Sequence, residues 1–310
     1  MVQQAIYARG MTKVGVVFPQ LEIGRDPGAI REYATAVEDM GFHHILAYDH
    51  VLGADTDRDD VNMLKWPPGH YTYREQFHEP LILFAYLAGL TRTVELVTGV
   101  LVLPQRQTAL VAKQAVEIQV LSNNRLRLGV GVGYNHLEFQ ALDVSFEGRG
   151  RRIEEQIGVL RELCSKQLVT MHGDYHRLDR VGLNPLPDSP IPIWMGATSP
   201  AGFRRVAAMA DGWICPGGAL SPMVRHWLDQ LDRALSGTRS PSPSFGIDGR
   251  LDVRFRPDEE VMREMALWQK IGATHVSVNT MAPYDRRSET LSVDGHIGLL
   301  QHTRELIELS

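Results

Sequence analysis

The sequence predicts an α/β fold in which eight parallel strands close into a barrel, and two observations lead to this prediction. Short apolar runs alternate with amphipathic helical segments eight times along the 310 residues. No G-x-G-x-x-G fingerprint follows the first apolar run, VGVVFPQLEIG, so a doubly wound dinucleotide-binding sheet is the less favoured alternative.

The first strand–helix–strand unit shows the pattern that the later units repeat. An apolar run at 14–19 ends in Pro-Gln and predicts a strand buried on both faces. A helix is expected at 27–40, because proline suits its first position and apolar residues recur at intervals of three and four. Gly41 ends this helix, and 44–50 (HILAYDH) is the second expected strand.

The other elements follow in the same order. Further strands are expected at 95–103, 125–134, 191–196, 212–216, 245–251 and 274–279, and further helices at 81–90, 108–121, 151–163, 201–210, 223–235, 258–271 and 295–309. Eight such units are typical of a TIM (β/α)8 barrel.

Three segments interrupt this alternation. Residues 167–190 contain two short β-prone runs around His-Gly-Asp, which predict an inserted hairpin. Residues 53–79 form a polar insertion, and residues 236–244 have the composition of a surface loop.

Composition limits the class of protein. A net charge of −5 argues against a nucleic-acid binder. Two cysteines, Cys164 and Cys215, are too few for a disulfide framework or a cysteine zinc site. No apolar stretch approaches the roughly 18 residues of a membrane span. We expect a cytoplasmic protein with a flexible leader at 1–11 and a single domain at 12–310.

A closed parallel barrel predicts that the chemistry lies at the carboxyl ends of its strands. The second strand ends in Asp49-His50, the sharpest titratable pair, and His50 can hold or take a proton near neutral pH. The alternative is a histidine satisfied by a hydrogen bond in the core.

Histidines also raise the question of a metal. A metal-dependent hydrolase on this barrel needs His-x-His on the first strand, and VGVVFPQ has none. His43 and His44 lie at the start of the second strand, at the opposite end of the barrel from the expected site. We therefore expect no metal in the site.

Glycines alternate on the fourth strand at Gly129, Gly131 and Gly133. Such a strand lacks side chains on one face, which admits either a planar ring or a closely packed neighbour. The pattern alone leaves both interpretations open.

The fifth strand ends in Gly196-Ala197-Thr198-Ser199, directly before a helix. Free N–H groups at a helix start, with hydroxyl groups beside them, favour an anionic group, although an ordinary helix cap explains the same residues. Gly217 and Gly218, after the sixth strand, allow a second stretch of backbone to approach. Aromatic residues in the 53–79 insertion either line an apolar pocket or pack on themselves: Trp66, Tyr71, Tyr73 and Phe77.

Several of these segments together resemble the luciferase-like oxidoreductase superfamily over residues 12–300. They are Asp49-His50, 99–106 (GVLVLPQR), Lys113, Leu121-Ser122, 125–133 (RLRLGVGVG), Glu138-Phe139, Arg149, Arg151, 191–196 (IPIWMG) and 210–213 (ADGW). The order and spacing of these motifs are more specific than any one of them.

The resemblance implies a TIM barrel with inserted segments that binds coenzyme F-420, a deazaflavin, or FMN. It implies a cis peptide bond between Gly99 and Val100, against which the ring lies, and a catalytic role for His50. The implied cofactor-binding residues are Asp49, Gly99, Val100, Gly131, Gly133, Gly196, Ala197, Thr198, Cys215, Pro216, Gly217 and Gly218. Tyr134 stands where the sugar-phosphate dehydrogenases of the family have a glutamate, which argues against that reaction and makes Tyr134 a candidate proton donor.

We therefore expect an oxidoreductase that transfers hydride between coenzyme F-420 and a small organic substrate. An FMN-dependent monooxygenase on the same barrel is the alternative, and a metal-dependent hydrolase or a cofactor carrier without activity is more remote. The resemblance makes a homodimer one option, and the sequence does not identify the substrate.

Overall fold

The computed structural model describes residues 11–55, 71–238 and 244–308. The expected leader, apart from Met11, lies outside the described residues, as do Trp66 and most of the expected loop at 236–244. In the described part of the chain, no helix combines the length and the apolar character that crossing a membrane requires.

The strands form one parallel sheet that closes on itself. Its members are β1 (Lys13–Val17), β2 (His44–Ala47), β3 (Glu95–Thr98), β4 (Leu101–Val102), β5 (Leu126–Gly131), β8 (Ile193–Gly196), β9 (Gly212–Ile214), β10 (Gly246–Asp252) and β11 (His275–Asn279). The sheet closes because β3 pairs with β2 on one side and with β5 on the other. The predicted closed barrel is confirmed, and the open doubly wound sheet is wrong.

The predicted third strand is divided into β3 and β4, which together occupy one position of the barrel. Leu96 pairs with Leu126 near the start of β5, and Leu101 pairs with Val130 near its end. Between the two pairings lies the Gly99–Val100 bond, which is cis as the resemblance implies.

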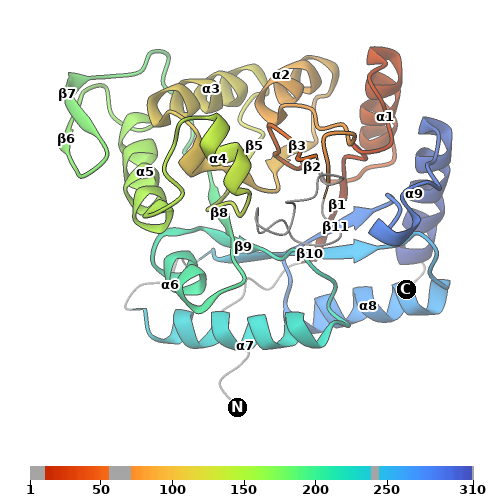
Figure 1. Cartoon of the computed structure of the whole chain (residues 1–310). Helices are drawn as coiled ribbons and strands as arrows, with labels where there is room; N and C mark the ends of the chain where they lie inside the picture. Colours follow the sequence, from red (N-terminus) through yellow and green to blue (C-terminus); the bar gives the residue numbers. More distant parts are fainter. Residues whose placement is uncertain (1–10, 56–70, 239–243, 309–310) are drawn as a thin grey trace.

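Helices surround the strands, as Figure 1 shows. They are α1 (Pro27–Asp39), α2 (Pro80–Leu90), α3 (Thr108–Leu121), α4 (His136–Ala141), α5 (Arg149–Leu163), α6 (Pro200–Met209), α7 (Pro222–Ser236), α8 (Asp258–Ile271) and α9 (Val293–Glu308). Their ends follow local chemistry: the side chain of Asp26 accepts a hydrogen bond from Gly28 N at the start of α1, and Gly272, with φ of +89°, ends α8.

The predicted hairpin is present as β6 (Val169–His172) and β7 (Arg177–Val181), an antiparallel pair outside the barrel beside α5 (Figure 1). The short helix α4, which follows β5, was not predicted. Two single turns of 3-10 helix were also not predicted: η2 (Leu103–Gln105) and η3 (Tyr284–Arg286).

Glu22 joins three loops at the carboxyl end of the barrel. Its carboxylate accepts hydrogen bonds from Ala282 N at 2.6 Å and Leu291 N at 2.9 Å, and it pairs with Arg254 at 2.8 Å. Burial raises the pKa of this group, but contacts with His296 and the two backbone N–H groups outweigh burial and lower the pKa to about 2. The charged Glu22 carboxylate therefore holds these loops together at the rim of the barrel.

We expect Glu22→Gln to lower stability more near neutral pH than in acid. The pKa falls from an ordinary value of 4.5 to about 2 in the folded state. The stabilisation is therefore complete above pH 4.5 and is lost as the pH falls toward 2. A shift of this size can supply about 3 kcal/mol, and partial access of water reduces this to about 1–2 kcal/mol. Urea unfolding of both proteins at about pH 7 and about pH 3 measures the difference. A gap of equal size at both pH values contradicts the assignment.

Candidate functional site

A cavity of about 610 Å³ opens at the carboxyl ends of the barrel strands. Twelve of the predicted site residues line it: Asp49, His50, Gly99, Val100, Gly131, Gly133, Tyr134, Gly196, Ala197, Thr198, Cys215 and Pro216. The volume lies within the range of small-molecule and cofactor sites. The structure thus brings residues from five different strand ends to one place.

Gly217 and Gly218 do not line this cavity. A Cβ atom on Gly217 would lie 3.0 Å from Val224 of α7, and one on Gly218 would collide with Glu264 of α8. These two glycines therefore let the loop after β9 pack against the surrounding helices. Their role in cofactor binding stays a prediction.

Val100 forms one wall of the cavity over a region without side chains. A Cβ atom added to Gly131 would lie 2.5 Å from Val100 Cγ2, and one added to Gly196 would lie 3.1 Å from Val100 Cγ1. The glycines of β5 and β8 are thus required for Val100 to occupy its place. The result is a wall in which the apolar side chain of Val100 lies over two glycines.

His50 lies between two polar groups and against two aromatic rings. Its Nδ1 lies 3.5 Å from the Glu138 carboxylate, and its Nε2 lies 3.4 Å from the Tyr134 hydroxyl. The His50 ring is 3.8 Å from the Tyr71 ring and 4.9 Å from the Phe77 ring, measured between centroids. These contacts fix the orientation of the imidazole at the cavity wall.

Glu138 is the buried centre of this network, and the sequence interpretation gave it no role. Its carboxylate accepts hydrogen bonds from Val51 N at 2.8 Å, Leu52 N at 3.1 Å, the Tyr71 hydroxyl at 3.1 Å and Gln105 Nε2 at 3.1 Å. Burial raises its pKa, but the adjacent His50, Gln105 and Leu52 N–H outweigh burial, so the pKa lies below its ordinary value. Glu138 is therefore an anion at neutral pH.

Helix α4 places Glu138 under His50. Asn135 begins this helix, and its side-chain oxygen accepts from the N–H groups of Leu137 and Glu138. The Asn135 amide also donates to Tyr71 and to the carbonyl of Leu52, which ties α4 to the loop after β2. An N-cap residue three positions before an acidic residue is the sequence signal that could have predicted α4.

Asp49 contacts the protein rather than presenting a free carboxylate. It accepts from Val102 N at 2.8 Å and pairs with Arg106 at 2.7 Å. Burial raises the pKa of Asp49 despite the opposing effect of Arg106. Asp49 thus holds β4 in place, next to the part of the cavity wall that Val100 forms.

The floor of the cavity is polar. Asp248 lines it and pairs with Arg127 at 3.0 Å, while Ser277 donates to Asp248 at 2.9 Å. Burial raises the pKa of Asp248, and Arg127 opposes this shift. The polar groups at the floor of the cavity are therefore paired with one another.

The start of α6 meets the cavity. Thr198 and Ser199 are exposed there, and Ser199 accepts from Gly202 N. Arg205, on the second turn of α6, lines the same region and pairs with Glu154 at 2.6 Å. Peptide N–H groups and hydroxyls at this point suit an anionic group.

Two further walls differ in how well the sequence predicted them. Tyr71 and Phe77 line the cavity, as the pocket interpretation requires, whereas Tyr73 is 57% exposed and does not. The segment 281–284 after β11, together with Arg287, also lines the cavity and was not predicted. Loop residues of this kind carry no periodic signal.

Comparison of the sequence with known proteins gives a family and informative relatives. A family model described as luciferase-like monooxygenase matches residues 10–307. An uncharacterized protein of Mycobacterium tuberculosis is 32% identical over 260 residues, which cover 83% of this chain and 86% of that protein. An F420-dependent glucose-6-phosphate dehydrogenase of Amycolatopsis mediterranei is 24% identical over 304 residues, covering 92% of this chain and 83% of the relative.

Solved structures share the fold. An F420-dependent secondary alcohol dehydrogenase, in complex with an F420–acetone adduct, superimposes with a TM-score of 0.73 at 16% identity, covering 96% of this chain and 99% of that one. A monooxygenase from Streptomyces bottropensis gives a TM-score of 0.71 at 16% identity, with the same shares covered. At this identity the likeness concerns the fold.

We expect Glu138→Ala to destabilise the protein by about 2–4 kcal/mol, because it leaves several buried donors without an acceptor. Glu138→Gln is the matched control. Its amide oxygen can still accept from Val51 and Leu52, and the unpaired Oε1 of Gln105 can accept from the new amide. We expect a loss below about 1.5 kcal/mol for this variant in chemical unfolding. Equal losses of unfolding free energy in the two variants would contradict the role of Glu138 as the shared hydrogen-bond acceptor of these donors.

Proposed function

The chain belongs to the luciferase-like monooxygenase family, and we propose that it is an oxidoreductase that transfers hydride between coenzyme F-420 and a small organic substrate. The observation that carries this proposal is the wall formed by Val100 and the glycines of β5 and β8, which lines the same cavity as the His50–Tyr134 pair. An apolar wall beside a group that can hold a proton suits a planar redox ring and its substrate.

The residues present fit a tricyclic ring with a phosphate-bearing chain. The ring would lie against Gly99, Val100 and Gly131, and the chain would extend toward Ala197 and Thr198 at the start of α6. When bound, the cofactor supplies the hydride chemistry, and the protein supplies orientation and a site from which water is excluded.

His50 is the proposed proton-handling group. Because Nδ1 lies beside the Glu138 carboxylate, we assign the hydrogen of the neutral ring to Nδ1 and the lone pair to Nε2. Nε2 faces the Tyr134 hydroxyl, at the place where a substrate hydroxyl can approach. Glu138 supports a positive charge on the ring as His50 takes up a proton.

An uncharged substrate suits this cavity better than a sugar phosphate. Among the described residues, each arginine that lines the cavity has an acidic partner: Arg205 has Glu154, Arg250 has Asp252 and Arg287 has Glu75. Burial also raises the pKa of Tyr134, so its hydroxyl group is uncharged near neutral pH. The substrate is therefore proposed to be a small organic molecule without a phosphate group.

An FMN-dependent monooxygenase is the second candidate, because the matching family is described as luciferase-like monooxygenase. The same cavity wall and the same helix start suit FMN. Both cofactors bring their own spectra, so direct titration separates the two proposals. A cytoplasmic location and a homodimer remain predictions.

Titration of the purified protein with F-420 and with FMN tests the proposal. We expect a dissociation constant in the micromolar range for one of them. If neither cofactor binds with a dissociation constant below about 1 mM, or about −4 kcal/mol, the proposal is contradicted.

We expect Gly131→Ala to weaken cofactor binding at least about tenfold, since its Cβ would displace Val100 from the wall. Gly298→Ala in α9 is the matched control, because a Cβ there meets nothing within 4 Å.

His50→Asn tests the proton-handling role. With the cofactor and an accepted substrate, we expect kcat to fall by about 10²–10⁴ while cofactor affinity changes little. His226→Asn, at an exposed histidine of α7, serves as the control and should leave kcat unchanged. Undiminished turnover in His50→Asn removes this residue from the mechanism.

A further inference from the structure

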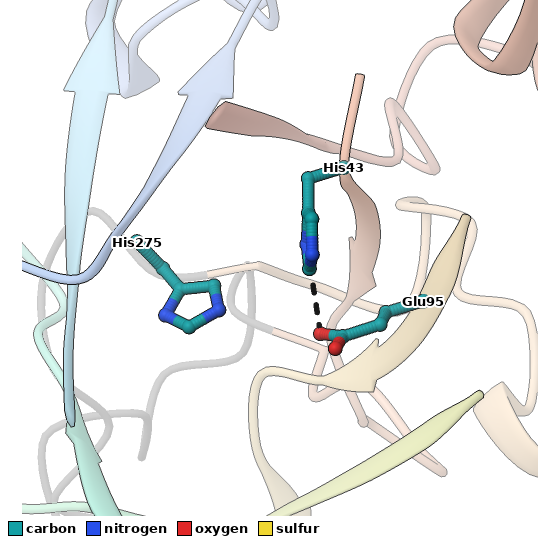
Figure 2. Close-up of side chains that lie close together, drawn as sticks. All are labelled: His43, Glu95 and His275. Carbon is teal, nitrogen blue, oxygen red and sulfur yellow. Dashed lines mark ion pairs between the residues drawn. The ribbon is translucent and has the colours of Figure 1, made fainter. Parts of the chain in front are cut away.

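Three side chains with metal-ligating atoms meet at the amino ends of the barrel strands, opposite the cavity. They are His43, which precedes β2, Glu95, the first residue of β3, and His275, the first residue of β11 (Figure 2). One ligating atom from each lies within 4.8 Å of the other two. None of the three lines the cavity described above.

The pairing register of neighbouring barrel strands brings these residues to one level. His44 pairs with Glu95 across β2 and β3, and His275 pairs with Lys13 at the start of β1, so the first residues of neighbouring strands lie at one level. The rings of His43 and His275 are 5.5 Å apart between centroids. Figure 2 shows the two rings and the Glu95 carboxylate converging on a common space.

The hydrogen bonds of Thr274 leave His275 with a free lone pair. The Thr274 hydroxyl donates to the carbonyl of Ile247 and accepts from Ile247 N. Its remaining contact, with His275 Nδ1 at 2.9 Å, is then satisfied when Nδ1 carries the hydrogen. This tautomer leaves Nε2 as the ligating atom, and a partner on the other ring nitrogen is typical of metal-bound histidine.

The other two residues have atoms that lack a hydrogen-bond partner. Among the described residues, His43 Nδ1 and Glu95 Oε2 are buried atoms without one. They lie 3.7 Å apart, and Arg127 Nε is 3.4 Å from the same carboxylate oxygen. Unsatisfied buried polar atoms are costly, so a ligand that contacts both is favoured.

Burial and the neighbouring charges act together on the two imidazoles of the cluster. Burial lowers the pKa of His43; Glu95 opposes this shift, and Lys13 and Arg127 add to it. Burial and Arg127 also lower the pKa of His275. Arg127 would repel a cation at this place, and its pair with Asp248 offsets part of that charge.

We propose that His43, Glu95 and His275 form a zinc site with three protein ligands, which ties β2, β3 and β11 together at the base of the barrel. Two imidazole nitrogens and one carboxylate oxygen are a ligand set that Zn²⁺ prefers, with water in the fourth position. The ligand atoms must close by about 1 Å to reach a common ion at about 2 Å. The side chains of His43 and Glu95 are 28% and 31% exposed and can make this adjustment.

Zinc binding to the metal-stripped full chain tests the proposal. Protein treated with chelator and dialysed is titrated with Zn²⁺ in competition with a chromophoric zinc indicator, and thermal unfolding is recorded with and without Zn²⁺. We expect one Zn²⁺ per chain and a higher melting temperature with the ion. Glu95→Gln and His275→Asn should each weaken binding at least about tenfold.

Two further variants keep the outcome decisive. His43→Asn changes a partly exposed ligand and should fold even if the buried His275→Asn does not, so its zinc affinity is read by itself. His302→Asn, at an exposed histidine paired with Asp258, is the control and should bind zinc like the unmodified protein. Absence of saturable binding, or equal affinity in His43→Asn, Glu95→Gln and the control, overturns the site.

Discussion

The structure depends on the third barrel position, where one interrupted strand pairs with both of its neighbours. β3 joins β2 to the start of β5, and β4 pairs with the end of β5, so this position closes the sheet. Between them, Val100 extends over Gly131 and Gly196, and no larger residue fits at either glycine without a shift. The closing strand and the cavity wall are therefore parts of one steric arrangement.

The two ends of the barrel treat buried polar groups in different ways. At the carboxyl end, the Glu138 carboxylate is fully engaged with backbone N–H groups, Tyr71 and Gln105, which makes the surroundings of His50 rigid. At the amino end, His43 and Glu95 retain unpaired atoms next to Arg127. Among the described residues, His50 Nδ1 and Gln105 Oε1 also lack a hydrogen-bond partner, so the contrast concerns the two carboxylates: Glu138 is saturated with donors, and Glu95 keeps an oxygen without one.

Periodicity predicted most of the fold, because strand and helix patterns are local. The helices at 108–121 and 258–271 were predicted to the residue, and the barrel followed from the number of units. The cis bond in the third strand was expected only from the resemblance, and the division of this strand into β3 and β4 was not predicted. The contact of Glu138 with His50 joins residues far apart in the sequence. The meeting of His43, Glu95 and His275 depends on the pairing register of strands that are also far apart in the sequence. Neither could be predicted from a local pattern.

The alternating glycines show why a local pattern can be correct and still ambiguous. The sequence allowed either close packing or approach of a ligand, and the structure assigns different tasks to different glycines of β5. A Cβ on Gly129 would collide with the Thr98 carbonyl, so this glycine serves packing within the barrel. Gly131 lines the cavity, and its missing side chain is replaced by Val100 from the neighbouring strand position. Packing and the shape of the cavity are thus linked here, since the wall of the cavity is built from the same close approach of Val100 to Gly131 that occurs where the barrel closes.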